Sequence, residues 1–193
     1  MKIDIHTHHP SMGTKTLSAI GIHPYDSEGV SPDTLFVIER DIEHYDAIGE
    51  IGLDFHHNIS RDQQILIFKS QLEIAQKYHK GVVLHCVKAF EPTMDILRNY
   101  TLPFVIFHGF IGSAIQATRA TKRGYYLSFG HRTFNSPKSM DAMRATPLEQ
   151  LFLETDESLI TIDEIYRQAA DVIGMPIPIL ESIISDNYNR ICG

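Results

Sequence analysis

Short apolar runs alternate with amphipathic helical segments along the whole chain, and this alternation constrains the fold more than any other feature. It is typical of parallel α/β folds, either an open doubly wound sheet or a closed barrel. Several runs are apolar on both faces, as in strands buried within a parallel sheet. The expected strands are residues 2–6, 17–22, 47–53, 81–85, 104–108, 125–129 and 151–154.

Helix start signals lie between these expected strands. Ser31 precedes a proline, Ser60 and Thr161 each open a capping-box sequence, and Ser113 precedes an apolar-periodic segment. Pro92 is expected to open a further helix, and a proline break precedes the last one. The helices are expected at residues 35–45, 65–78, 93–100, 114–122, 161–173 and 179–188. With no repeat or linker to divide it, residues 1–193 are expected to form a single domain.

Residues that can bind metal lie towards the end of, or just after, different expected strands. They are His6, Glu50, His85, His108 and Asp156. The mouth of a barrel brings the carboxyl ends of its strands together, whereas the outer strands of an open sheet diverge at about 4.8 Å per neighbour. We therefore expect a TIM-type (β/α) barrel.

Two patterns suggest metal binding over a structural role. Strand alternation directs His6 and His8 to the same side, where two imidazoles can hold one ion, while His9 faces away. Glu50 stands in an apolar strand between Gly49 and Gly52, so it needs either a cation or an ion-pair partner.

His85, His108 and Asp156 each end or follow an apolar run. Each alone would fit a satisfied core histidine or a solvated loop aspartate. Their conjunction with the preceding residues favours a site of nitrogen and oxygen ligands for two metal ions.

The sequence resembles the TatD-like metal-dependent hydrolases of the amidohydrolase superfamily, which include the TatD deoxyribonucleases. The most specific shared segments are Gly-Glu-Ile-Gly-Leu-Asp at 49–54 and Glu-Thr-Asp at 154–156, and the order of motifs is shared over nearly the whole chain. The other matching segments are residues 4–8, 21–24, 82–85, 108–110 and 187–190. The resemblance implies a distorted (β/α) barrel and metal-dependent phosphodiester hydrolysis.

Carried over position by position, the resemblance implies two divalent metal ions. Mixed imidazole and carboxylate ligation accommodates Zn, Mn or Fe, and Mg through the carboxylates, so Mg, Mn or Zn is expected without a choice among them. One ion would be bound by His6, His8, Glu50 and Asp156, with Glu50 bridging to the other. His85 and His108 would hold the second ion. A metal-bound hydroxide would attack the phosphoester, with Asp156 as the catalytic residue that orients that water and takes its proton, and Glu50 setting the separation of the metals.

The chain departs from the family between its first two expected strands, where residues 10–18 replace a helix, a strand and another helix. An incomplete barrel of seven strands is therefore expected, consistent with a length below the roughly 200 residues of a full barrel. The first two strands must then pair directly or leave a gap. Val87 and Gly109 stand where relatives often have arginine and cysteine, and Tyr25 replaces a frequent histidine, which leaves His23 as a candidate substrate-binding residue.

Composition narrows the function further. With 24 acidic and 17 basic residues, the net charge of −7 argues against binding nucleic acid over a broad basic surface, which favours action on DNA ends or short single strands. Two cysteines and the absence of a long apolar run indicate a cytoplasmic protein with no membrane partner. The alternatives are a PHP-type phosphoesterase, a lactonase-like amidohydrolase, and a non-catalytic metal-binding descendant.

Overall fold

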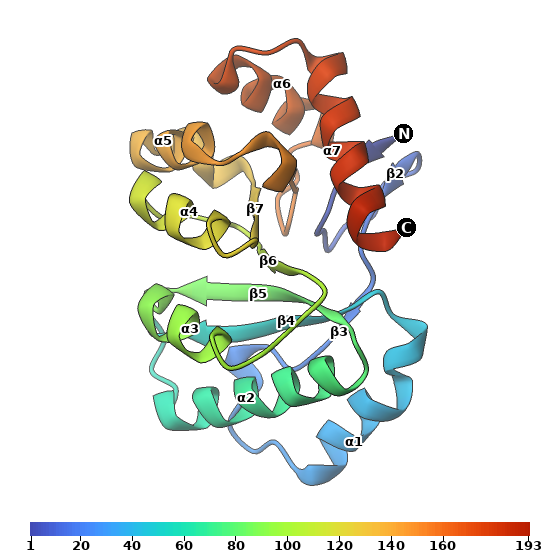
Figure 1. Ribbon diagram of the computed structural model, residues 1–193, viewed down its shortest axis with the longest axis vertical. Helices are drawn as coiled ribbons and strands as arrows, with labels where there is room; N and C mark the ends of the chain where they lie inside the picture. The colour runs from blue at the N-terminus through green and yellow to red at the C-terminus, as the bar shows by residue number, and fades with distance from the viewer. The chain divides into compact units, whose positions relative to one another are not determined.

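The computed structural model describes residues 1–193, except for the side chain of residue 32, and the chain forms two compact units. The first unit consists of Met1–Leu17 and Phe107–Gly193, and the second of Ser18–Ile106 (Figure 1). Each unit combines parallel strands with helices.

Eight strands are β1 (Lys2–Ile3), β2 (Thr14–Lys15), β3 (Ala19–Ile20), β4 (Ala47–Asp54), β5 (Gly81–Val87), β6 (Val105–Phe107), β7 (Tyr126–Phe129) and β8 (Leu151–Leu153). The α-helices are α1 (Pro32–Asp41), α2 (Arg61–Lys77), α3 (Phe90–Leu97), α4 (Ala114–Thr121), α5 (Pro137–Ala145), α6 (Ile162–Ile173) and α7 (Ile177–Cys192). Short 3₁₀ helices are η1 (Pro24–Asp26), η2 (Ile42–His44), η3 (His131–Asn135) and η4 (Leu148–Gln150).

In the second unit, β3, β4 and β5 form a parallel ladder in which Ala47 pairs with both Ala19 and Gly81. Helix α2 runs along these strands (Figure 1) and buries Phe68 and Leu72 against them. Because helices cover parallel strands, β4 is buried along nearly its whole length. This packing fixes β4 and β5, which carry the candidate ligands Glu50 and His85.

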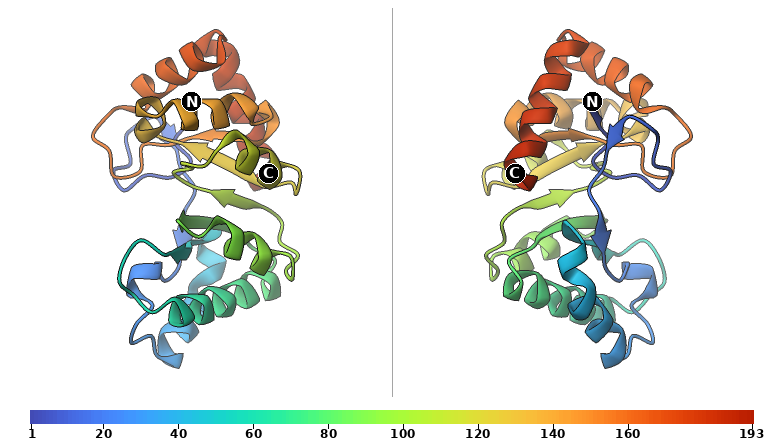
Figure 2. Two further views of the ribbon diagram at one scale, coloured as in Figure 1. Left: turned by 90° about the vertical axis from the view of Figure 1, so that its left-hand side faces the viewer. Right: turned by 90° about the vertical axis from the view of Figure 1, so that its right-hand side faces the viewer.

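In the first unit, β1 and β2 are parallel neighbours, and the chain beyond them continues the pairing. The amide of Asp4 donates to the carbonyl of Lys15 at 2.9 Å, and that of Leu17 to Ile5 at 3.3 Å. Ile5 in turn donates to Leu153 at the end of β8, which pairs with β7. Figure 2 shows the red helix α7 beside the blue N-terminal strand, which it contacts.

The seven expected strands all occur, and β2 is an additional one. The strand paired with β1 is β2, which lies within the short connection, so direct pairing of β1 with β3 is not observed among the described residues. The strand paired with β3 is β4, and Leu17 alone of the second expected strand donates its amide to the first segment, at Ile5. The TIM-type prediction is consistent with the α/β architecture and its parallel pairing. No helix among the described residues is long and apolar enough to span a membrane.

Helix starts follow the expected chemistry with two corrections. The side chain of Ser113 accepts the amide of Gln116 in a full capping box. Helix α3 begins before Pro92, which occupies its first turn. An amide there would have no partner within the helix, so its absence in proline loses no helical hydrogen bond. Helix α5 was not predicted, although Ser136 caps it and a proline follows.

Candidate metal centre

His6, His8 and Asp156 converge in the first unit. Their potential ligand atoms all lie within 4.8 Å of one another. Asp156 Oδ1 is 3.8 Å from His6 Nε2 and 3.7 Å from His8 Nε2, and the two imidazole centroids are 5.2 Å apart. Two imidazole nitrogens and a carboxylate oxygen facing one point form a donor set suited to a divalent transition metal.

The backbone fixes this cluster. The amide of His8 donates to the carbonyl of Asp156 at 3.0 Å, and the amide of Asp156 donates to His6 at 3.1 Å, which together make a parallel bridge around Thr7. Asp156 has a φ of 54°, a left-handed conformation that is uncommon outside glycine but tolerated best by Asp and Asn. The bridge therefore holds the aspartate in a strained conformation that directs its side chain at both imidazoles.

His108 adds a second histidine to the same unit. Its ring centroid lies 4.7 Å from that of His6, and its Nδ1 lies 3.4 Å from Glu154 Oε1, which also accepts the amide of Gly109 at 2.6 Å. Burial alone would raise the pKa of Glu154, but the interaction with His108 holds that pKa below its usual value. A carboxylate facing Nδ1 favours the neutral tautomer of His108 with its proton on that nitrogen, in which Nε2 carries the lone pair.

Glu50, His85 and His23 form the cluster of the second unit, with ligand atoms within 4.8 Å of one another. Glu50 Oε2 lies 4.0 Å from His85 Nδ1. Glu50 falls where the register of β4 against β5 shifts, between Ile48 and Ile51. Such an irregularity turns a side chain out of simple strand alternation, and here it occurs at the candidate ligand.

Asp54 orients His85 from behind. Its Oδ2 lies 3.0 Å from His85 Nε2, and the carboxylate is fully buried. Burial would raise the pKa of Asp54, but the hydrogen bond from His85 and those from the following loop hold it well below its ordinary value. An ionised carboxylate can only accept, so His85 carries its proton on Nε2 and directs the Nδ1 lone pair towards Glu50.

His23 differs from His85 and His108 in the contact that its Nδ1 makes. The amide of Tyr25 donates to its Nδ1 at 3.2 Å, and its ring lies 4.4 Å from that of His85. When Nδ1 accepts a hydrogen bond, the neutral ring has its proton on Nε2 and acts as a donor. His23 is thus better suited to a substrate oxygen than to a metal ion.

Sequence reasoning assigned no role to Asp54 or Glu154. Both end apolar strands and are fully buried, and a buried carboxylate requires hydrogen-bond donors. A carboxylate in a buried strand could therefore have been recognised from the sequence as needing a partner, since each residue lies in a motif that also contains a candidate ligand. The sequence could not show which histidine each carboxylate contacts.

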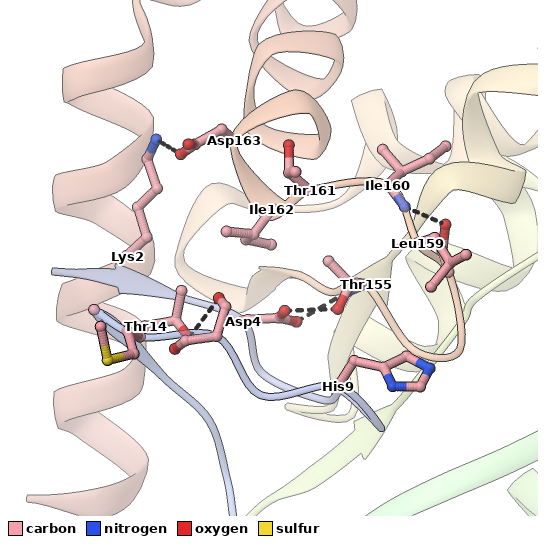
Figure 3. A pocket seen from close by; sticks show the side chains of 14 residues that line it. Lys2, Asp4, His9, Thr14, Thr155, Leu159, Ile160, Thr161, Ile162 and Asp163 are labelled. Carbon is pink, nitrogen blue, oxygen red and sulfur yellow. Dashed lines mark hydrogen bonds and ion pairs between the residues drawn. The ribbon is translucent and has the colours of Figure 1, made fainter.

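A separate cavity of about 470 Å³ lies in the first unit. Figure 3 shows Asp4 directed at Thr155 along its wall, with His9 at one edge and Asp163 bonded to Lys2 at another. Burial raises the pKa of Asp4 to about 6, against two hydrogen bonds from Thr155 that lower it. None of the six candidate ligands is among the described residues that line this cavity.

Taken unit by unit, the donor sets fit divalent metal ions. The first unit presents three imidazoles and an aspartate, and the second presents an imidazole and a glutamate. In each unit, a buried carboxylate contacts one nitrogen of a candidate histidine ligand, an arrangement that metal sites use to fix the tautomer.

Comparison with known proteins identifies the family. The model of the family described as TatD related DNase matches residues 5–193. The uncharacterized metal-dependent hydrolase YabD of Bacillus subtilis is 30% identical, over 90% of this chain and 76% of its own length. The 3'-5' ssDNA/RNA exonuclease TatD of Salmonella typhimurium is 33% identical, over 72% of this chain and 56% of its own.

Solved structures show the same fold. YjjV, a TatD homologue from Escherichia coli, aligns with a TM-score of 0.84 at 24% identity, covering 94% of this chain and 78% of its own. A TatD family hydrolase from Entamoeba histolytica aligns with a TM-score of 0.80 at 18% identity, covering 93% and 75%. The α/β fold with its parallel strands is therefore that of the TatD structures. This chain belongs to the TatD-related DNase family.

Proposed function

We propose that this protein is a TatD-type nuclease that hydrolyses phosphodiester bonds at DNA ends or in short single strands. The observation that carries the proposal is the convergence of His6, His8 and Asp156, because these ligand types within 4.8 Å suit metal-assisted hydrolysis. Relatives named as a deoxyribonuclease and as a 3'-5' ssDNA/RNA exonuclease support a nucleic acid substrate. The low cysteine content suits the cytoplasm.

Two divalent ions, Mg, Mn or Zn, are proposed as cofactors. In the first unit, His6, His8, His108 and Asp156 would hold metal, and in the second unit Glu50 and His85 would do so. Bound metal would polarise phosphoryl oxygens and make a water molecule more acidic. We propose that residues 1–193 act as one domain, since one family model spans residues 5–193.

Each of three side chains has a separate proposed role. Asp156 is proposed to accept the proton of the attacking water, because its carboxylate faces two imidazoles and is held by the backbone on both sides. Glu50 is proposed to position metal beside His85. His23 would donate from Nε2 to a substrate oxygen, since its Nδ1 already accepts from Tyr25.

A substrate panel tests this proposal. Protein supplied with Mg, Mn or Zn should shorten end-labelled single-stranded DNA and should act poorly on a phosphomonoester and on a lactone. Preferential hydrolysis of the lactone would instead favour a lactonase-like amidohydrolase, and preference for the phosphomonoester a PHP-type enzyme. Metal binding without turnover of any substrate would favour a non-catalytic descendant.

A further inference from the structure

A row of three exposed rings and a cation lies on the second unit, and we call Tyr25, His57, His56 and Lys88 the ring row. The rings of Tyr25 and His57 are 4.3 Å apart, those of His57 and His56 are 5.4 Å apart, and Lys88 Nζ lies 3.0 Å from His56 Nδ1. Tyr25 is 42% exposed and the His57 side chain 47% exposed. The row therefore offers aromatic surface and one cation to a ligand from solvent.

The ring row is held in place by Asp54. The Tyr25 hydroxyl donates to Asp54 Oδ2 at 3.0 Å, and the amides of His56 and His57 donate to Oδ1 at 2.8 and 3.2 Å. His57 Nδ1 lies 3.2 Å from the same oxygen. One buried carboxylate thus anchors all three ring residues, which reduces the ordering that a ligand would otherwise have to impose.

Lys88 supports a binding role through its backbone. Its φ of 51° is in the left-handed region, which is uncommon for a residue with a long side chain. Such strain persists only where surrounding structure imposes it, and it concentrates at functional sites. Here it accompanies an exposed ammonium group that reaches His56, in a protein whose net charge is −7. A local cation is what an otherwise acidic protein needs to contact a polyanion.

The ring row also continues to the candidate ligands of the same unit. His23 contacts Tyr25 at 4.3 Å and His85 at 4.4 Å between ring centroids, and His85 faces Glu50. A ligand bound along the ring row would therefore extend from the Glu50 and His85 cluster towards Lys88. This continuity ties the row to the chemistry proposed for that cluster.

We infer that the ring row binds single-stranded nucleic acid, with a base stacked on Tyr25 or His57 and a phosphate contacted by Lys88. Proteins bind single strands with exposed aromatic faces beside a cation, because every base has a planar face that can stack and every phosphodiester link carries a negative charge. In a duplex those faces are already stacked on one another. The inference deepens the proposed function and rests on it for the identity of the substrate.

Binding to a fluorescein-labelled oligothymidylate of about 12 nucleotides, followed by anisotropy, tests the inference. Using the full chain in EDTA prevents metal-dependent hydrolysis during the titration. Tyr25→Leu and His57→Ala should each weaken binding on the order of 10-fold, whereas Tyr25→Phe, which keeps the ring, should stay within about twofold. Lys88→Gln should reduce the slope of log affinity against log salt by about 0.7, the value for one phosphate contact on a single strand.

Lys77 and Tyr78 provide matched controls in the same unit, because Lys77 Nζ lies 5.2 Å from the Tyr78 ring centroid at the end of α2. Lys77→Gln and Tyr78→Leu should bind as the unmodified protein does. A duplex of the same length should bind more weakly and should not respond to Tyr25→Leu.

Unchanged affinity in both Tyr25→Leu and His57→Ala, or equal losses in the Tyr78→Leu control, would overturn the inference. So would an equal effect of Tyr25→Leu on the duplex. The proposed function fails separately: a protein that binds the oligonucleotide through Tyr25 but cleaves no phosphodiester with metal present would retain the ring row and lose the nuclease assignment.

Discussion

The Nε2 of His85 lies 3.0 Å from Oδ2 of Asp54, so the histidine is held with its proton on the side away from Glu50. Asp54 has no exposed surface and also accepts the Tyr25 hydroxyl and two backbone amides. The side chain of Gln64 bonds to both backbone groups of Asp54. Its Oε1 accepts the Asp54 amide at 2.7 Å, and its Nε2 donates to the Asp54 carbonyl at 2.9 Å. The orientation of a candidate ligand is therefore set by residues outside the cluster of His23, Glu50 and His85.

The Asp54→Asn substitution should disturb that orientation while nearly conserving shape. The amide oxygen would satisfy the two backbone donors, leaving an NH₂ group facing His85 and favouring the tautomer with the proton on Nδ1. Metal affinity should fall about 10- to 100-fold, measured by calorimetry. Asp46→Asn is the control, since Asp46 accepts from Ser18 in the same unit without contacting a histidine.

The tautomer itself can be observed by nitrogen NMR of His85 in the metal-free protein. We expect the proton on Nε2 in the unmodified protein and a shift towards Nδ1 in Asp54→Asn. A proton on Nδ1 in the unmodified protein would show that Asp54 does not set the tautomer, whatever the variant does.

Gly52→Ala should destabilise the protein and damage the cluster of the second unit. Gly52 has a φ of 134°, and an added Cβ would lie 2.1 Å from the carbonyl oxygen of His85. Strain and overpacking together should lower the free energy of unfolding by about 3 kcal/mol or more, measured with urea. Gly29→Ala, with a φ of 79° and open space around the added Cβ, should cost about 1 kcal/mol. Equal effects at the two positions would argue against the steric contact.

Much of the candidate site was predictable because its residues occur in local sequence patterns. His6 and His8 follow from strand alternation, and Asp156 from its place after an apolar run. What could not be predicted depends on tertiary contact. The pairing of Asp54 with His85 joins residues from different strands, and the turn of Glu50 depends on a register shift between β4 and β5.

Two elements, β2 and α5, were not predicted from the sequence. Strand β2 has only two residues, too few for any periodicity to show, and it exists because β1 supplies its hydrogen bonds. Helix α5 is the least apolar of the α-helices, and only its Ser-Pro start marked it. The seven other strands carried longer apolar runs.

Metal stoichiometry distinguishes one ion from two. Under replete conditions, elemental analysis should give about two divalent ions per chain. His85→Ala and His108→Ala should each lower the occupancy of one position and leave the other largely filled, because each histidine lies in a different cluster. A value that never exceeds one at saturation would contradict the proposed pair of ions.

Thiol reactivity should separate the two cysteines. Burial raises the pKa of Cys86 to about 11, so only on the order of one thiol in a thousand is ionised at pH 8. Cys192 is exposed at the end of α7. Iodoacetamide at pH 8 should therefore label Cys192 first, and Cys86 labelling should accelerate as pH rises towards 11. Mass spectrometry of tryptic peptides would reveal a reversed order.

Loss of a metal ligand should affect activity differently from loss of the proton acceptor. His6→Ala should weaken metal binding, and excess metal should restore part of its activity because His8 and Asp156 still define the position. Comparing activity at low and saturating metal provides the measurement. Activity in His6→Ala that stays absent at every metal concentration would assign His6 a role beyond metal binding.

The role of Asp156 can be measured in the Asp156→Asn protein, by its rate of single-stranded DNA hydrolysis at saturating metal with the bound metal quantified. The substitution keeps the size of the side chain and an acceptor oxygen but removes the charge that would take the proton. We predict that metal stays largely bound while turnover falls by about 100-fold or more at every metal concentration. Turnover equal to that of the unmodified protein would contradict the role proposed for Asp156.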